Sequence, residues 1–536
     1  MTRPGEHPRR RSLPLALLRP PKLVSTSGVN TNTFAPPLNV AYLAGTLRRH
    51  GYDPVVVDGC GLAPDALTPL EDLPFLVNGL SLADLVARIP PQTRLIGVSC
   101  MFSSEWYFHV RVLEALRAAF PSAVIVAGGE HISAEPEACL LACAALDVCV
   151  VGEGEETLLA LADAIEAGTP IDRIEGTVVR THGGEVRNNG KRNRIRAIDD
   201  IPWPDWGGIP VEAYLDRRCA MDEQVKRTLP MLASRGCPYK CTFCSNPNMW
   251  GVNWFGRSPE DIVDEIAHYK RTYAIEHVEF YDLTTVLDRK WVVRFTRALI
   301  DRELGVSWAM PPGTRSEALD TEILSLMARS GCSSVTYAPE SGSEETLESI
   351  KKKVDLDRMV QSIRRAVKTG LHVKTNIIFG LPDQTMRDGV KTLRFAMRLA
   401  FAGVHDVLVF PFNPYPGSEL YQRLVAQGRI HPTSPEHPRF LLSADYGNTT
   451  AVRSWSDHLS ARRIFATSAL TMAVFYVLQF VRRPQRALWT VRNLARGTPQ
   501  TWLERMLFGQ ARRRRYRRTK ARHPASAPLA EMLPVA

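Results

Sequence analysis

Cysteines are few in this sequence, and they are scattered. Ten cysteines in 536 residues do not form the dense framework of a disulfide scaffold, and they fit a reducing compartment. The basic N-terminal stretch is followed by an apolar segment that prolines interrupt, so it does not have the form of a secretory signal peptide. Long apolar runs are also scarce, and 45% hydrophobic with 23% charged residues excludes disordered, collagenous and multi-spanning proteins. We therefore expect a cytoplasmic protein of about three domains.

Positive charge is concentrated at the C-terminal end. Residues 451–536 carry 17 lysines and arginines against three acidic residues, although the net charge of the whole chain is only +11. This region contains an apolar run at 464–481, which a pair of arginines brackets at each end. As a helix the run would be about 27 Å long, marginal for spanning a bilayer, so we prefer a helix lying on a membrane to one that spans it. Two other interpretations stay open: a helix buried in the catalytic domain with a solvated basic tail, and contact with RNA or DNA.

Short apolar runs alternate with helical segments over residues 12–170. The runs are rich in β-branched residues, which is typical of strands buried on both faces of a parallel sheet. Strands are predicted at 13–18, 53–57, 95–99, 123–127 and 148–151, and helices at 38–50, 82–89, 105–119 and 156–165. This alternation predicts an α/β, doubly wound, Rossmann-like domain that binds its ligand at the carboxyl ends of the strands. The small or flexible residues at those ends are Ser99, Gly128, Gly129, Glu130, Gly152, Glu153 and Gly154.

A second alternating pattern follows a polar stretch. Residues 171–226 read as a linker with a hairpin around Gly183-Gly184, and residues 1–11 as a disordered N-terminus. Residues 227–430 predict a partial TIM-type (β/α) barrel, and 431–536 a helical, basic C-terminal extension. The barrel strands are expected at 224–232, 278–281, 306–310, 334–338, 373–379 and 407–410.

Three cysteines lie within eight residues, directly after the first expected barrel strand: Cys237, Cys241 and Cys244. Three thiolates on one loop can hold three irons of a cubane cluster and leave the fourth iron open for substrate. A structural zinc site needs four ligands, and Cys219 and His268 lie too far along the chain to be natural fourth ligands. The spacing therefore favours an iron–sulfur cluster over zinc or over three reduced thiols in a turn.

The segment from Cys237 to Cys244 resembles the CxxxCx(aromatic)C signature of the radical S-adenosylmethionine (SAM) superfamily. Downstream, residues 256–260, 280–282, 336–343 and 377–382 are similar to later barrel segments of that superfamily. The resemblance implies that the three cysteines bind a [4Fe-4S] cluster whose open iron chelates SAM. It also implies SAM contacts from Phe243, Asp282, Arg315, Glu340 and Ser341.

The N-terminal domain is similar to the cobalamin-binding domain that precedes the barrel in the cobalamin-dependent radical SAM subfamily. The similar segments are 37–51, 127–131, 136 and 151–157, and the resemblance assigns the residues at the carboxyl ends of the strands named above to cobalamin. None of the 13 histidines follows an Asp by two positions, so the Asp-x-His-x-x-Gly loop of other corrinoid proteins is absent. The resemblance therefore implies base-off cobalamin with no protein histidine on cobalt.

By this resemblance the chain cleaves SAM to a 5′-deoxyadenosyl radical and methylates an unactivated carbon of a hydrophobic substrate, such as a lipid, hopanoid or tetrapyrrole. An oxidative or ring-forming reaction of the anaerobic porphyrin-ester cyclase type is the alternative on the same scaffold. A non-catalytic corrinoid or redox sensor is the alternative of another class. The expected partners are an electron donor such as flavodoxin or ferredoxin and the inner face of the membrane, met peripherally; nucleic acid is not expected.

Overall fold

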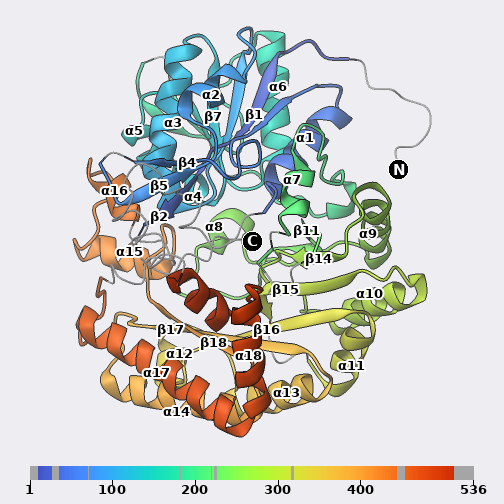
Figure 1. Ribbon diagram of the computed structural model, residues 1–536. Helices are drawn as coiled ribbons and strands as arrows, with labels where there is room; N and C mark the ends of the chain where they lie inside the picture. The colour runs from blue at the N-terminus through green and yellow to red at the C-terminus, as the bar shows by residue number, and fades with distance from the viewer. Residues whose placement is uncertain are drawn as a thin grey trace, which may run out of the picture.

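The N-terminal part of the chain forms a seven-stranded sheet with helices on both faces (Figure 1). Our computed structural model describes residues 10–26, 35–70, 72–181, 183–218, 220–221, 226–314, 319–442 and 453–511. The expected disordered segment 1–11 lies outside these residues, apart from its last two. The strands of the sheet are, in spatial order, β10 (Val186–Asn188), β9 (Thr177–Arg180), β8 (Val148–Val150), β7 (Val124–Gly128), β6 (Leu95–Ser99), β1 (Leu15–Arg19) and β3 (Val55–Asp58).

The five strands from β8 to β3 are parallel, and the strand order reverses between β1 and β6. In such sheets ligands bind outside the carboxyl ends at the reversal. One face buries its apolar residues under α1 (Leu38–Arg49) and α6 (Glu155–Ala167). The other face is covered by α2 (Leu82–Ala87), α3 (Trp106–Ala119) and α5 (Pro136–Ala142), and the short helix α4 (Glu130–Ala134) follows β7. The predicted doubly wound domain is thus confirmed.

Two features of this domain differ from the sequence-based expectation. The hairpin of β9 and β10 pairs antiparallel with β8, so the sheet continues to Asn188, inside the segment 171–226 that we expected to be a linker. A separate three-stranded sheet was not predicted; it consists of β2 (Lys22–Ser25), β5 (Phe75–Asn78) and β4 (Leu67–Pro69). Its strands are only three or four residues long, which is too short for a periodic signal. The rest of 171–226 contains the short helices η2 (Ile198–Asp200) and α7 (Val211–Asp216).

Six parallel strands form the second layer, a partial barrel whose edge strands are β11 and β18. In order they are β11 (Thr228–Met231), β14 (His277–Phe280), β15 (Ser307–Thr314), β16 (Cys332–Glu340), β17 (His372–Phe379) and β18 (Asp406–Pro411). All six lie where the alternating pattern predicted strands. The helices between them are α9 (Pro259–Tyr273), α10 (Arg289–Arg302), α11 (Thr321–Arg329), α12 (Glu344–Ser349), α13 (Leu356–Lys368) and α14 (Met386–Ala402), and α15 (Glu419–Ala426) follows β18.

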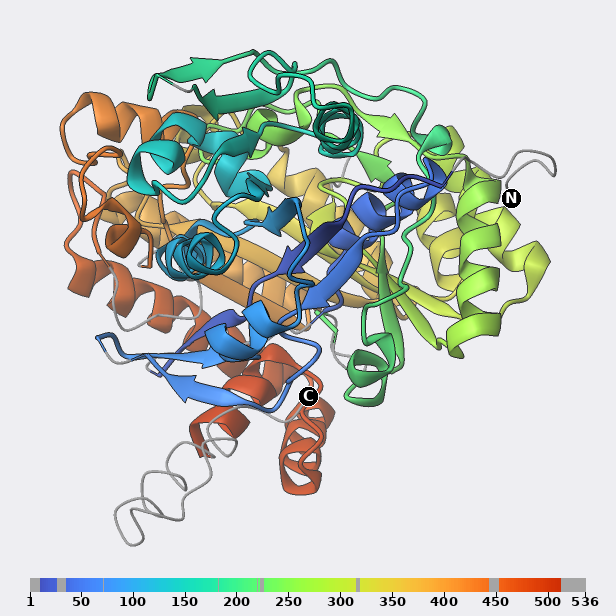
Figure 2. The same cartoon turned by 90° about the horizontal axis from the view of Figure 1, so that it is seen from above.

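The carboxyl ends of the two sheets face each other. Helix α8 (Asn246–Trp250) lies between the layers in Figure 1, and Figure 2 shows from above that the N-terminal layer lies over the barrel. The short strands β12 (Ser234–Arg235) and β13 (Phe255–Gly256) pair antiparallel with each other. Arg235 is only 5% exposed and reaches across the interface, donating to Glu153 over 3.0 Å and to Glu155 over 2.6 Å. Burial alone lowers the pKa of Arg235, and the carboxylates of Glu155 and Glu153 outweigh it and raise that pKa. This buried ion pair fixes the start of the cysteine segment against the N-terminal domain.

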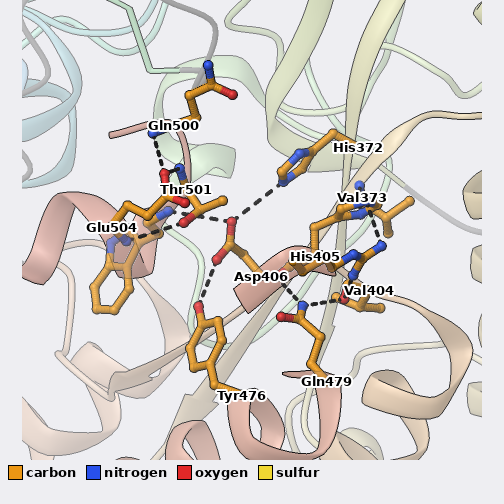
Figure 3. Close-up of polar contacts among 12 residues, drawn as sticks. His372, Val373, Val404, His405, Asp406, Tyr476, Gln479, Gln500, Thr501 and Glu504 are labelled. Carbon is orange, nitrogen blue, oxygen red and sulfur yellow. Dashed lines mark hydrogen bonds and ion pairs between the residues drawn. The ribbon is translucent and has the colours of Figure 1, made fainter. Parts of the chain in front are cut away.

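The C-terminal region packs against both layers. Helix α16 (His437–Leu441) contacts α3, and α17 (Ala461–Arg482) packs along α14 and β18, whereas α18 (Pro484–Arg496) turns away from it (Figure 1). Figure 3 shows the polar contacts at the amino end of β18, where Tyr476 donates to the buried carboxylate of Asp406 over 2.7 Å. Gln479 donates to the carbonyls of Val404 and His405 over 2.8 and 2.6 Å. Polar side chains of α17 thus attach this helix to the barrel.

Gln479→Leu removes the donor that Gln479 supplies to the carbonyls of Val404 and His405, which leaves Val404 with Arg486 alone. We expect it to destabilise the barrel by about 1–3 kcal/mol, seen as a lower midpoint in chemical denaturation. Gln485→Leu is the matched control, because Gln485 is exposed on α18. Equal midpoints for the two variants would contradict the attachment of α17 through Gln479.

Arg235→Met leaves Glu155 as a buried charge without its arginine and leaves Glu153 paired with Arg194 alone. Removing one member of a buried pair costs about 3–5 kcal/mol, so we expect a large drop in the unfolding midpoint. Arg227→Met removes ion pairs with Glu212 and Asp216, whose carboxylates are mostly exposed, and should cost at most about 1 kcal/mol. Equal decreases in the unfolding midpoint of the two variants would contradict the larger contribution of the Arg235 ion pairs to stability.

Candidate functional site

The cysteine segment forms a loop between β12 and α8. Gly236 has a φ of +94°, and a Cβ there would lie 2.0 Å from the carbonyl oxygen of Asn253, so only glycine fits before Cys237. The amide of Thr242 donates to the carbonyl of Ile350 over 3.1 Å, and its carbonyl accepts from Leu420 over 2.9 Å. The barrel loops therefore fix the backbone of the cysteine loop from both sides.

Cys237, Cys241 and Cys244 are partly exposed, whereas the other six cysteines in the described residues are buried. Cys219 lies outside the described residues. Burial, together with the nearby Glu130 and the two other thiols, raises the pKa of Cys244 to about 12. A positively charged iron centre would lower this pKa again, because it stabilises the thiolate. The three cysteines are therefore suited to hold an iron–sulfur cluster.

A single metal ion fits less well. Nowhere in the described ranges do three His, Cys, Asp or Glu side chains converge closely enough to hold one ion. A cubane cluster does not need such convergence, because each thiolate binds a different iron. The three cysteines are therefore suited to a cluster rather than to zinc.

Asp282 lies beneath the start of the cysteine loop. It is buried and accepts from the amide of Ala233 over 3.0 Å and from the hydroxyl of Ser234 over 2.5 Å. Burial raises its pKa to about 6. The carboxylate that we expected to contact SAM therefore also positions the residues that lead into the loop.

Glu340 and Ser341 lie at the carboxyl end of β16, as expected. Glu340 has a φ of +65°, which is rare for a side chain other than glycine, and its carboxylate accepts from Lys352 over 2.9 Å. Ser341 is fully buried and accepts from the amide of Ser343 over 3.1 Å. Phe243 is partly buried and packs against the barrel core, and Arg315 lies outside the described residues. Their contacts with SAM stay predictions.

Buried hydroxyls without a partner gather near the carboxyl ends of the barrel strands. Those of Thr242, Thr284, Thr285 and Thr314 form no hydrogen bond within the described chain. Buried polar groups are almost always hydrogen-bonded in native proteins, so such orphans indicate a polar ligand. Because SAM carries polar groups that can bond to such hydroxyls, this edge of the barrel fits SAM.

The residues expected to contact cobalamin all lie at the carboxyl edge of the N-terminal sheet. Ser99 ends β6 at the reversal of strand order and accepts from Asn39 over 2.6 Å. Gly129 has a φ of +125°, and a Cβ there would lie 2.6 Å from the carbonyl oxygen of Cys100, so the turns after β6 and β7 approach closely only with glycine. Gly128 lies beside it, and Gly152 and Gly154 lie in the turn after β8. Glu153 points instead to Arg235 and Arg194.

Phe102 is a candidate site residue that the sequence did not single out. It follows β6 at the reversal of strand order and is 63% exposed, although most aromatic residues of this domain are buried. An exposed aromatic ring at the expected ligand position suits the flat, apolar face of a corrin. The edge therefore fits cobalamin.

The two expected cofactor edges touch. Glu130, on the cobalamin side, accepts from the hydroxyl of Ser245, the residue after Cys244, over 2.5 Å. Burial raises the pKa of Glu130, and the bond from Ser245 opposes this shift. The corrinoid edge and the cluster loop are thus joined by one direct hydrogen bond.

A second buried contact joins the layers beside it. Glu135 of the N-terminal domain accepts from Tyr421 of α15 over 2.5 Å, and His437 of α16 lies 2.9 Å from the same carboxylate. The sequence did not indicate these contacts, because the partners are 286 and 302 residues apart in the chain.

Comparisons with known proteins agree with both halves of the site. The Radical SAM superfamily model matches residues 231–396, and the B12 binding domain model matches residues 25–162. Together these matches make up more than half of the chain.

Curated relatives include methyltransferases and a cyclase. An uncharacterized methyltransferase of Pyrococcus horikoshii is 28% identical over 398 residues, which are 74% of this chain and 80% of the relative. Cytidylyl-2-hydroxyethylphosphonate methyltransferase of Streptomyces wedmorensis is 29% identical over 458 residues, 80% and 85% of the two chains. Anaerobic magnesium-protoporphyrin IX monomethyl ester cyclase of Rubrivivax gelatinosus is 27% identical over 396 residues, 73% and 66% of the two.

The fold is also that of a solved radical SAM methyltransferase, TsrM from Kitasatospora setae, with a TM-score of 0.60 at 18% identity over 77% of this chain and 76% of that one. A cysteine loop suited to a cluster, a sheet edge suited to a corrinoid and the two family matches all concern the same pair of facing edges. The chain therefore belongs to the cobalamin-dependent radical SAM enzymes, whose cofactors are a [4Fe-4S] cluster, SAM and cobalamin.

Proposed function

We propose that this enzyme is a C-methyltransferase acting on an unactivated carbon of a hydrophobic substrate. The observation that carries the proposal is the hydrogen bond between Glu130 and Ser245, because it joins the corrinoid edge directly to the cysteine loop. Methyl transfer needs both cofactors to reach one substrate carbon, and facing edges in contact meet that requirement. The methyltransferases among the relatives support the same choice.

When bound, the cluster with SAM supplies hydrogen abstraction and cobalamin supplies the methyl group. Cys237, Cys241 and Cys244 would hold the cluster, and Phe102 would lie against the corrin. The chain's own residues hold the geometry: Arg235 and Glu130 fix the loop to the N-terminal sheet, and Asp282 fixes the residues that lead into it. Rigid placement of this kind is the main contribution that a protein makes to cofactor chemistry.

The location is part of the proposal. We assign the enzyme to the cytoplasm and to the inner face of the membrane, where a lipid, hopanoid or tetrapyrrole substrate is met, with flavodoxin or ferredoxin as electron donor. A ring-forming reaction is the second candidate, because a cyclase acting on a protoporphyrin ester is among the relatives. A purely sensory role does not require a cysteine loop with an open iron position.

The test uses anaerobically reconstituted enzyme with cobalamin, reductant, a membrane-lipid and pigment extract, and SAM labelled in its methyl group. We expect label in an extractable product together with 5′-deoxyadenosine, both detected by mass spectrometry. Omitting cobalamin should remove the label. Formation of 5′-deoxyadenosine that depends on the extract but transfers no label would support the ring-forming reaction instead, and no 5′-deoxyadenosine with any extract would support the sensor.

Cys237→Ala, Cys241→Ala and Cys244→Ala should each abolish cluster binding, because two thiolates on the loop do not retain a cubane cluster. Iron content should fall from about four per chain towards zero, with loss of the visible absorption of the cluster. Cys332→Ala is the matched control, because Cys332 is buried in the barrel core. Retention of iron in any of the three loop variants would contradict the ligand assignment.

A further inference from the structure

Helix α17 exposes apolar residues to solvent although it also buries polar ones. Its buried face holds Ser468, Thr471 and Gln479 together with the large residues Ile464, Phe475 and Tyr476. The opposite face has the same spacing and only apolar side chains, at Ala466, Leu470, Ala473, Val477 and Val481. A surface helix of a globular protein normally exposes polar residues on its outer face instead. The outer face of α17 is therefore adapted to an apolar or interfacial environment.

The neighbouring helix α14 extends this exposed apolar surface. Its start and end lie beside those of α17: Thr467 contacts Met386, and the guanidinium of Arg482 lies over the ring of Phe401. We call the combined set the α14–α17 surface; its members, each between 41% and 73% exposed, are Met386, Val390, Phe401, Phe465, Leu470, Val477 and Val481. Large exposed apolar side chains on two helices that pack against each other are typical of an interaction site.

Basic side chains lie at both ends of α17. Arg462 and Arg463 lie at the start of α17, Arg482 lies at its end, and all three are exposed. Between residues 453 and 511 there are nine arginines and two acidic residues. Helix α18 adds exposed Leu488, Trp489 and Val491. Apolar side chains with arginine and tryptophan beside them are the combination that anionic bilayers bind.

Helix α17 has the length and composition of a membrane span, but only a third of its most apolar window is buried in the protein. Spanning would separate Gln479 from the carbonyls of Val404 and His405, and Tyr476 from Asp406. Losing buried hydrogen bonds of this kind is costly in hydrocarbon. The helix therefore stays on the barrel while its outer face remains available.

We propose that the α14–α17 surface docks the enzyme on an anionic lipid bilayer, with α17 lying in the interfacial plane. The surface begins beside the carboxyl end of β17, where Ile464 contacts Gly380, so docking keeps the mouth of the barrel close to the membrane. This inference deepens the membrane location in the proposed function. Its test measures binding rather than turnover, so it can fail while methyl transfer stands.

The experiment is flotation of the full-length, reconstituted enzyme with vesicles of phosphatidylglycerol and phosphatidylcholine. We expect flotation with mixed anionic vesicles, weaker flotation with phosphatidylcholine alone, and a decrease as salt is added, because arginine attraction is screened. Leu470→Asp with Val477→Asp should lower the vesicle partition coefficient by at least about tenfold. Both residues are exposed, and an unchanged melting temperature and iron content will show that the double variant is folded.

Leu141→Asp is the matched control, because Leu141 is exposed on α5 of the N-terminal domain, away from the surface. It should float like the unmodified enzyme. Equal flotation of the double variant and the control, or no flotation of the unmodified enzyme, would overturn the proposal. It would also be overturned if light scattering showed a dimer that the double variant dissociates, because a second copy would then cover the surface.

Discussion

The buried contact of Arg235 with Glu153 and Glu155 is the constraint on which the site depends. It places an arginine from the strand before the cysteine loop between two carboxylates, that of Glu153 in the turn after β8 and that of Glu155 at the first residue of α6. A buried guanidinium cannot shift far from such partners, because its charge would be left without compensation. The relative position of the two sheet edges, and with it the distance between the two cofactors, follows from this contact. The bonds of Glu130 with Ser245 and of Glu135 with Tyr421 then fix the same interface at two more points.

The local parts of this structure could be predicted from the sequence. Strands buried on both faces are short apolar runs, and β6 occupies the residues 95–99 that the pattern indicated. The three cysteines lie on one loop and are partly exposed, as their spacing in the chain predicted, and their role as cluster ligands stays a prediction. The apolar run of α17 was visible in the sequence, but the sequence did not show which of its residues are exposed and which are buried.

The non-local parts could not be predicted. The carboxylates that pair with Arg235 lie about eighty residues earlier in the chain, and Tyr421 and Glu135 are 286 residues apart. Such pairings depend on how one layer is placed on the other, and no periodicity or spacing encodes that. Glu153 illustrates the consequence: the family resemblance assigned this residue to cobalamin, but its contacts with Arg194 and Arg235 could not be foreseen. The hairpin of β9 and β10 likewise joins a sheet that the polar pattern of its residues did not reveal.

The apolar core that begins under α1 and α6 continues without interruption into the barrel. Each layer therefore relies on the other to bury part of its apolar surface, although each matches its own family model. A barrel separated from the N-terminal sheet would expose the side chains that this shared core buries, together with the charge of Arg235. A chimera that joined one layer to the other layer of a relative would have to match this buried surface as well as the cofactor sites.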